Sequence, residues 1–228
     1  MTFSMNTAAV GVTLCTAFAG ASVTITGAST TATATFDMSG SPSDSGADSS
    51  SLQSGPLPQT ISSDLLFVVP PMSGSSMTAD LSSSLTVSNL SAVGSSDAFI
   101  EWTRGGSGVT GASLRTFVYF TVVGSIQYDL DASFALQSPG NFLSLKDGTG
   151  AQIEGTPVGA TLDETGVLGP GTYTLEFRLN RSASGSGGTS LLFDTSGEFS
   201  LVFSEVPAPG AFAVLAMGLG AATRRRRG

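Results

Sequence analysis

The stretch Ser125–Gln137, SIQYDLDASFALQ, decides the fold class, because apolar and polar side chains alternate along it. Ile126, Tyr128 and Leu130 are apolar, whereas the residues that alternate with them, such as Gln127 and Asp129, are polar. Successive side chains of a β-strand point to opposite faces of the sheet, so the alternation places the apolar set on one face. We therefore predict a strand with one face in the core and the other in water.

Two further stretches repeat this pattern. Thr172–Asn180 and Gly197–Ser204 also carry aromatic or aliphatic residues at every second position. Each is predicted to be a half-buried strand. We expect four aromatic side chains of these three stretches to be buried: Tyr128, Phe134, Phe177 and Phe199.

Leu114–Val123 is apolar on both faces, which is typical of a strand in the middle of a sheet. Gly124-Ser125 follows it directly and predicts a two-residue hairpin to the strand that begins at Ile126. Asp147-Gly148 and Pro170-Gly171 predict further turns. Weaker patterns predict five more strands: Ser22–Phe36, Asp64–Val69, Met77–Val87, Asp97–Thr103 and Asn141–Leu145.

These signals predict an all-β fold, an antiparallel β-sandwich or jelly roll of about ten strands. Residues 22–205 show no helical period, so short apolar helices are expected only at the two ends of the chain. The same residues are numerous enough for one domain with its own core. Within it, Ser39–Ser63 is rich in Ser, Gly and Pro and is predicted to be a long mobile loop.

The charge of the chain excludes one large class of partners. Four of the nine Lys and Arg residues stand together at Arg224–Arg227, and all 17 Asp and Glu residues lie between Asp37 and Glu205. Without that arginine cluster, five basic residues remain against 17 acidic ones, a net charge of −12. Binding to phosphates requires Lys and Arg, so we expect no nucleic-acid partner.

The side chains that the sequence lacks exclude several kinds of active site. The chain contains no His, and its one Cys, Cys15, falls in the segment that we interpret below as an export signal. A Ser-His-Asp triad, a Cys-His dyad and a zinc site with His or Cys ligands are therefore excluded. We predict a non-enzymatic protein without catalytic residues, cofactor-binding residues or metal ligands.

Asp129 and Asp131 are the strongest candidates for carboxylate chemistry, because residues two apart on a strand share a face. Such a pair could bind Ca²⁺ or act as the acid and base of a glycosidase. Ca²⁺ takes about six to eight oxygen ligands, so a solvated acidic face is the favoured interpretation. Asp147–Gly150 has the start of a calcium loop without the later ligands and is predicted to be a turn. Trp102, the single tryptophan, alternates in phase with Ile100 and is predicted to pack in the core.

The last 23 residues have a separate organisation. A Pro-containing segment, Val206–Gly210, precedes the uncharged stretch Ala211–Ala222, and Arg224–Arg227 follows. As a helix, the uncharged stretch would extend about 18 Å, which is short against a hydrocarbon core of about 30 Å. An apolar stretch followed by cations is typical of a membrane signal whose cationic end stays in the cytoplasm. A buried C-terminal helix is the alternative, but this stretch lacks the polar face of an amphipathic helix.

Val206–Gly228 resembles the PEP-CTERM sorting signal, in which a Pro-containing motif, an apolar stretch and an arginine cluster follow one another. The motif residues here are Val206, Pro207, Ala208, Pro209 and Gly210, and the cluster is Arg224, Arg225, Arg226 and Arg227. The sequence differs from the commonest pattern at Ala208, where the family usually has Glu. The resemblance implies an exported protein of a Gram-negative bacterium that makes exopolysaccharide, with a tail that an exosortase processes.

Such a tail requires export, and we interpret residues 1–21 as a signal peptide. Residues 1–36 contain no charged side chain, and the apolar stretch Ala8–Ala21 ends in a small-x-small cleavage pattern, Ala19-Gly20-Ala21. The usual Lys or Arg before the apolar region is absent from Met1–Asn6, so either the signal is atypical or the true start lies further upstream. A first buried strand is the alternative interpretation.

Together these observations predict an exported, non-enzymatic protein of the cell envelope or extracellular matrix, structural or adhesive, with transient inner-membrane anchoring. Its expected partners are an exosortase-like enzyme, the membrane and exopolysaccharide. A carbohydrate-binding module is the first alternative: an exposed row of aromatic side chains on one sheet would support it, and a buried Trp102 would count against it. A glycosidase that uses carboxylates alone is the second, and it needs two acids facing each other across a cleft.

Overall fold

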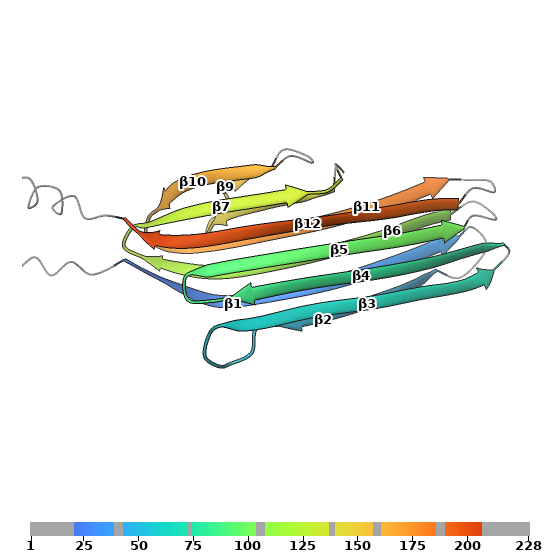
Figure 1. Ribbon diagram of the computed structural model, residues 1–228, viewed down its shortest axis with the longest axis horizontal. Coiled ribbons are helices and arrows are strands. Elements are labelled where there is room, and N and C mark those ends of the chain that lie inside the picture. Colours follow the sequence, from blue (N-terminus) through green and yellow to red (C-terminus); the bar gives the residue numbers. More distant parts are fainter. Residues whose placement is uncertain are drawn as a thin grey trace, which may run out of the picture.

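The computed structural model describes residues 21–38, 43–72, 74–103, 108–136, 140–156, 161–185 and 190–206. The regular structure of these residues is β-strand, which confirms the all-β prediction. Two six-stranded antiparallel sheets pack face to face as a sandwich (Figure 1). The helices predicted at the two ends fall in residues 1–20 and 207–228, outside the described residues.

The first sheet, sheet A, has the strand order β2-β1-β6-β11-β8-β9. Its strands are β1 (Ser22–Met38), β2 (Asp44–Ser51), β6 (Gly108–Val123), β8 (Phe142–Asp147), β9 (Gln152–Gly155) and β11 (Gly171–Gly185). β6 lies between β1 and β11, as the apolar pattern of Leu114–Val123 predicts.

The second sheet, sheet B, has the strand order β10-β7-β12-β5-β4-β3 and lies in front of sheet A in Figure 1. Its strands are β3 (Gln59–Met72), β4 (Ser75–Val87), β5 (Ser91–Thr103), β7 (Ile126–Phe134), β10 (Leu162–Leu168) and β12 (Ser190–Glu205). The five weaker strand predictions all fall on observed strands, whereas β2, β9 and β10 were missed.

The core between the sheets is built from the alternating apolar residues. Tyr128, Phe177 and Phe199 are buried as predicted, and so is Trp102. Phe134 is only half-buried, contrary to the prediction, because β7 ends at this residue. Its ring still stacks on Phe177 with 5.2 Å between the ring centroids, so it closes one end of the core.

A row of hydroxyl groups crosses the middle of this core. Ser63, Ser83 and Ser96 are cross-strand partners in sheet B, Thr30 and Thr116 are partners in sheet A, and all five are buried. Ser83 Oγ accepts a hydrogen bond of 3.0 Å from Ser96 Oγ within sheet B, and its hydrogen bond of 3.3 Å with Thr116 Oγ1 joins the two sheets. Thr30 Oγ1 and Ser63 Oγ have no hydrogen-bond partner within the described ranges. We call these five residues the hydroxyl row.

Gly124-Ser125 is not a hairpin, and that prediction was wrong. β6 belongs to sheet A and β7 to sheet B, so these two residues carry the chain from one sheet to the other. Gly124 has a φ of 80°, a conformation that glycine adopts without strain. Pro170-Gly171 likewise stands where β10 of sheet B gives way to β11 of sheet A. Asp147-Gly148 does form a turn, between β8 and β9 of one sheet.

Ser39–Ser63 is not one long loop, so this prediction was also wrong. β2 occupies Asp44–Ser51, and β3 begins at Gln59. β2 is an edge strand whose small and polar side chains are mostly exposed, so its pairing with β1 through the backbone leaves no apolar alternation in the sequence. Gly46 is needed there, because a Cβ at this position would lie 2.8 Å from Cδ2 of Phe67.

Candidate functional site

Most of the predicted sorting residues lie outside the described structure. Val206, directly after β12, is the last residue described. Beyond it are Pro207, Ala208, Pro209, Gly210, Arg224, Arg225, Arg226 and Arg227. Of the predicted signal peptide, residues 1–21, only Ala21 is described. The described ranges contain no helix that is long and apolar enough to cross a membrane.

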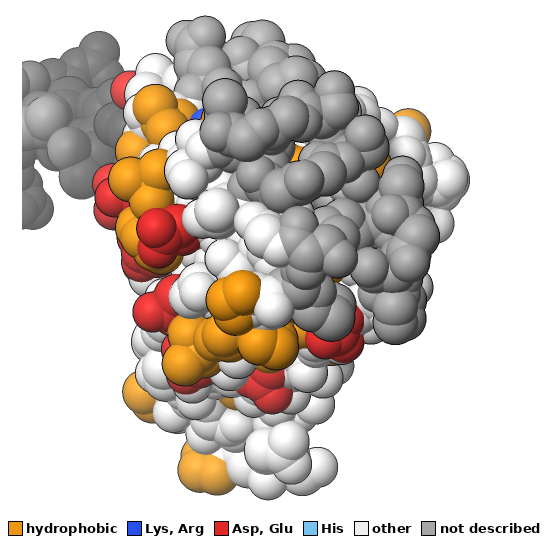
Figure 2. Space-filling view, turned by 90° about the vertical axis from the view of Figure 1, so that its right-hand side faces the viewer, with side chains coloured by type: hydrophobic (Ala, Val, Ile, Leu, Met, Phe, Trp, Pro, Cys, Tyr) orange, Lys and Arg blue, Asp and Glu red, His pale blue; other side chains and the backbone are white. Residues whose placement is uncertain are grey.

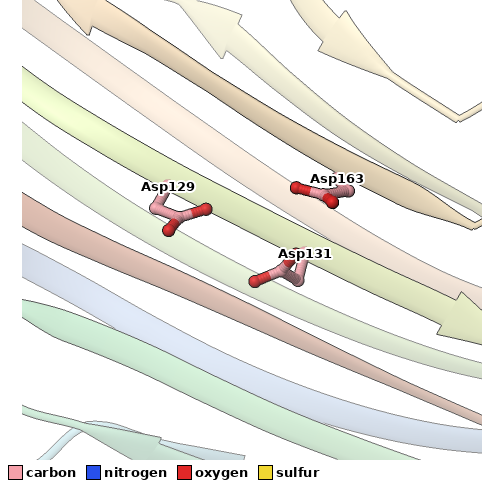
Figure 3. A group of neighbouring side chains, drawn as sticks. All are labelled: Asp129, Asp131 and Asp163. Carbon is pink, nitrogen blue, oxygen red and sulfur yellow. The ribbon is translucent and has the colours of Figure 1, made fainter.

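Three carboxylates come together on the outer face of sheet B (Figure 3). Asp129 and Asp131 project from β7 to the same side, as their spacing predicts. Asp163 of β10 is the direct cross-strand partner of Asp131. One oxygen of each carboxylate lies within 4.8 Å of the other two, and all three side chains are exposed. We call these three residues the acidic cluster.

The pKa of Asp131 lies above its ordinary value. Partial loss of hydration is the largest cause, and the charges of Asp129 and Asp163 add to it. Ca²⁺ takes about six to eight oxygens, so three carboxylates on an open sheet would leave most positions to water. This arrangement resembles a solvated acidic face more than a built metal site. Sequence reasoning missed Asp163, because its position depends on the pairing of β10 with β7.

The acidic cluster belongs to a larger face that carries acids without cations. The outward positions of sheet B hold Asp64, Asp80, Asp97, Glu101, Asp129, Asp131, Asp163, Asp194 and Glu198. Exposed apolar side chains lie among them: Leu66, Val68, Val93, Phe99, Leu192 and Val202. Acidic and hydrophobic side chains lie next to one another in the end-on view of Figure 2. The six strands of sheet B contain no Lys or Arg.

Two neighbouring hollows lie on this acidic face. The larger, of about 490 Å³, is lined by Asp131 and Glu198 among Ser and Thr side chains of β4, β5, β7 and β12. The smaller, of about 400 Å³, shares Glu198 and Ser95 with it and adds Asp97. Asp131 and Glu198 stand on neighbouring strands of one sheet, so they lie side by side and do not face each other across a cleft.

Asp147–Gly150 forms the predicted turn and uses its carboxylate internally. Asp147 Oδ1 accepts hydrogen bonds from Thr149 Oγ1 at 2.7 Å, from Thr149 N at 2.9 Å and from Ala151 N at 2.9 Å. These bonds, above all the one from the Thr149 side chain, lower the pKa of Asp147. One oxygen of the Asp147 carboxylate is therefore already engaged in the turn.

The outer face of sheet A carries an aromatic pair, in which Tyr119 is exposed and Phe117 is half-buried. Phe117 and Tyr119 follow one another on this face of β6, and their ring planes differ by 9° with 6.1 Å between the centroids. Tyr119 is 42% exposed. A β-bulge in β1 between Ile25 and Gly27 lies opposite Tyr119. The two rings border a hollow of about 460 Å³, which Thr172, Thr174, Lys146 and Glu176 also line.

Cations gather beside this aromatic pair. Of the four described Lys and Arg residues, Arg115, Lys146 and Arg178 stand on the outer face of sheet A. Lys146 Nζ lies 3.5 Å from Glu176 Oε2, the only ion pair in the described ranges. Arg115 and Arg178 are direct cross-strand partners, and neither is paired with a carboxylate of the described residues. We call Arg115, Phe117, Tyr119, Lys146, Glu176 and Arg178 the aromatic–cation patch.

Burial and charge both act on Arg178 within this patch. Its Nε is buried and has no hydrogen-bond partner, and its guanidinium carbon lies 5.8 Å from the centre of the Phe142 ring. Burial is the largest cause of its lowered pKa, the charge of Arg115 adds to the effect, and Glu176 opposes it. The charge of this guanidinium is therefore incompletely balanced by the described residues.

The structure bears on the carbohydrate-binding alternative in two opposite ways. Trp102 is 1% exposed, which counts against a sugar site at this residue. The exposed ring of Tyr119 and the half-buried ring of Phe117, with polar side chains around them, are the features on sheet A that favour such a site. Sequence reasoning missed the pair, because an apolar pattern on both faces of Leu114–Val123 does not indicate which face is open.

Comparison with known proteins adds no relative to this picture. No protein-family model matches the chain, and a search of curated proteins finds no match. The resemblance of Val206–Gly228 to a sorting signal therefore stands on the sequence alone. Function has to be argued from the two outer faces of the sandwich and from the tail.

Proposed function

We propose that this chain is an exported, non-enzymatic protein of the cell envelope or extracellular matrix with a structural or adhesive role. Its tail, Val206–Gly228, is a sorting signal for an exosortase-like enzyme and anchors the chain transiently in the inner membrane. The β-sandwich is the part that acts outside that membrane.

One observation supports an adhesive role above the others: the charged and aromatic chemistry of the sandwich lies on open faces. Acids cover the outer face of sheet B, and the aromatic–cation patch lies on sheet A. An open face can contact a second surface, whereas a glycosidase places two carboxylates on opposite sides of the scissile bond. Asp131 and Glu198 lie side by side on one sheet, which favours adhesion over catalysis.

Carbohydrate binding is the second candidate, and the aromatic pair favours it. Tyr carries an apolar ring with a polar hydroxyl, which suits a wet surface that contacts sugars. Tyr119 is exposed beside Phe117, and threonine side chains of β11 stand next to both. The two candidates are compatible, because an adhesive protein of a matrix can adhere by binding its polysaccharide.

The sorting proposal is tested by the C-terminal peptide of protein recovered from the native cell. We expect protein outside the inner membrane to lack Arg224–Arg227, and a variant with these four residues changed to Ser to accumulate unprocessed. Arg115→Ser, which also removes a cation but lies in β6, is the control and should be processed normally. Matrix protein with an intact arginine cluster contradicts cleavage of the tail.

The non-enzymatic proposal is tested by screening purified protein against a panel of polysaccharides for released reducing ends. We expect no hydrolysis, because Asp131 and Glu198, the acids that line the larger hollow on sheet B, lie side by side and are not opposed across a cleft. Hydrolysis that is lost on Asp131→Asn, but kept in Asp97→Asn on the same face, would show that the assignment is wrong.

A further inference from the structure

The aromatic–cation patch contains a charge conflict that the described residues leave unresolved. Arg115 and Arg178 stand directly opposite each other on β6 and β11, and like charges in that position repel. Glu176, the carboxylate whose charge acts on Arg178, is paired with Lys146. Half-burial of Arg178 adds a desolvation cost to the repulsion. An anion between the two guanidinium groups would relieve both.

The aromatic pair adjoins the two arginines on the same face. Arg115, Phe117 and Tyr119 follow at every second position of β6, so neighbouring side chains are about 7 Å apart along the strand. The bulge opposite Tyr119 is a feature that often re-aims side chains at functional sites. A Cβ at Gly27 would lie 3.5 Å from Tyr119 Cδ2, so the ring rests over a glycine instead of over a side chain. The surface thus offers apolar rings next to two adjacent arginines.

One class of ligand has both complementary features. A guanidinium group binds a carboxylate through two parallel hydrogen bonds, and the C–H face of a sugar ring packs against an aromatic ring. Inorganic phosphate would satisfy the arginines and leave the rings unused. A neutral glycan would satisfy the rings and leave the arginines unpaired.

We propose that the outer face of sheet A binds an acidic polysaccharide, a chain of sugars that carry carboxylate groups. Arg115 and Arg178 bind a carboxylate, while Phe117 and Tyr119 pack against a sugar ring of the same chain. This inference rests on the proposed adhesive function and names what the protein adheres to. The acids of sheet B repel such a ligand, so only one side of the sandwich binds it.

The probe is an oligogalacturonate, and its fully methyl-esterified form is the control, because esterification removes the charge and keeps the sugar. Titration calorimetry with the full chain should give binding of the acid form that is about tenfold or more tighter than that of the ester. Added salt should weaken binding of the acid form and leave binding of the ester nearly unchanged.

Two sets of variants separate the contribution of the arginine from that of the ring. Arg115→Gln should weaken binding of the acid form about tenfold and leave binding of the ester unchanged. Leu66→Glu makes the same change of net charge on sheet B and should have little effect on binding of either form. Tyr119→Ala should weaken binding of both forms, whereas Tyr119→Phe should retain most of the affinity. Val109→Ala, on the same face of β6, is the control. Urea unfolding of each variant checks that the sandwich is intact.

Equal affinity for the acid and the ester, or full affinity in both Arg115→Gln and Tyr119→Ala, overturns the inference. Absence of binding to either form by correctly folded full chain also overturns it. These measurements do not depend on the tail. A protein that is exported but does not bind therefore refutes this inference alone, whereas one that binds but stays in the cytoplasm refutes the proposed export.

Discussion

Asp131→Asn should stabilise the protein at neutral pH, because it removes one of three crowded like charges. The carboxylate oxygens of the acidic cluster lie within 4.8 Å of one another. At that separation, two unit charges in water repel by about 0.9 kcal/mol. Screening at physiological ionic strength, where the Debye length is about 8 Å, reduces this to about 0.5 kcal/mol. With Asp129 and Asp163 both acting on Asp131, the expected gain is about 1 kcal/mol, the upper end for exposed charges.

The gain should depend on pH in a direction that the raised pKa of Asp131 fixes. The folded state holds this proton more tightly than the unfolded state, so stability falls as pH rises from the ordinary carboxyl pKa through the folded one. Asn cannot ionise and escapes that loss. The variant should therefore be more stable than the native protein at pH 7 and equal to it at about pH 3, where carboxylates are largely protonated.

Urea unfolding at both pH values, with a chelator present to remove divalent ions, measures these differences. Asp97→Asn is the matched control, because Asp97 is exposed on the same face with serines as its cross-strand partners. It should change the free energy of unfolding by less than about 0.5 kcal/mol. A gain in Asp131→Asn that persists at pH 3 or in high salt, or no gain at pH 7, would refute the electrostatic reasoning.

Two further predictions concern the core. Thr30→Val should stabilise the protein by about 1 kcal/mol, because Thr30 Oγ1 is buried without a hydrogen-bond partner in the described residues. The same change at its cross-strand partner Thr116 removes the hydrogen bond with Ser83 and should cost about 1 kcal/mol. Urea unfolding of both variants measures the contrast, and equal effects would contradict it. Gly94→Ala should destabilise by about 1–3 kcal/mol, because the added Cβ overlaps the ring of Phe199; thermal melting detects this, and an unchanged melting temperature would show that the ring moves away freely.

Strands with one buried face were predictable from the sequence, and strands held mainly by their backbone were not. Ser125–Gln137 and Thr172–Asn180 alternate because each buries one face; β7 occupies Ile126–Phe134 of the first stretch, and the second lies within β11. β2 buries few of its side chains and pairs through backbone groups that every sequence possesses, so the sequence of Asp44–Ser51 was interpreted as part of a loop. Gly124-Ser125 fits a hairpin and a change of sheet equally well, because the strands on both sides alternate in either case.

The candidate sites depend on pairing between distant strands, which alternation does not specify. Asp129 and Asp131 were found because they share one strand, but Asp163 joins them through the register of β10 against β7. Arg115 and Arg178 are separated widely in sequence and meet only through the register of β11 against β6. A single sequence gives the face of each side chain and leaves its cross-strand neighbour undetermined.

The change of sheet at Gly124-Ser125 also sets how the sandwich carries mechanical load. Ser22 pairs with Val123, and Glu205 pairs with Ile126, so β1 starts and β12 finishes beside this same corner (Figure 1). In the anchored state that we propose, a tether after Val206 would hold the sandwich by one end, and β12 alone extends about 50 Å away from it. The proposed ligand on the outer face of sheet A would then pull along the strands. Hydrogen bonds perpendicular to the strands resist that force in shear, many at once, instead of opening one after another.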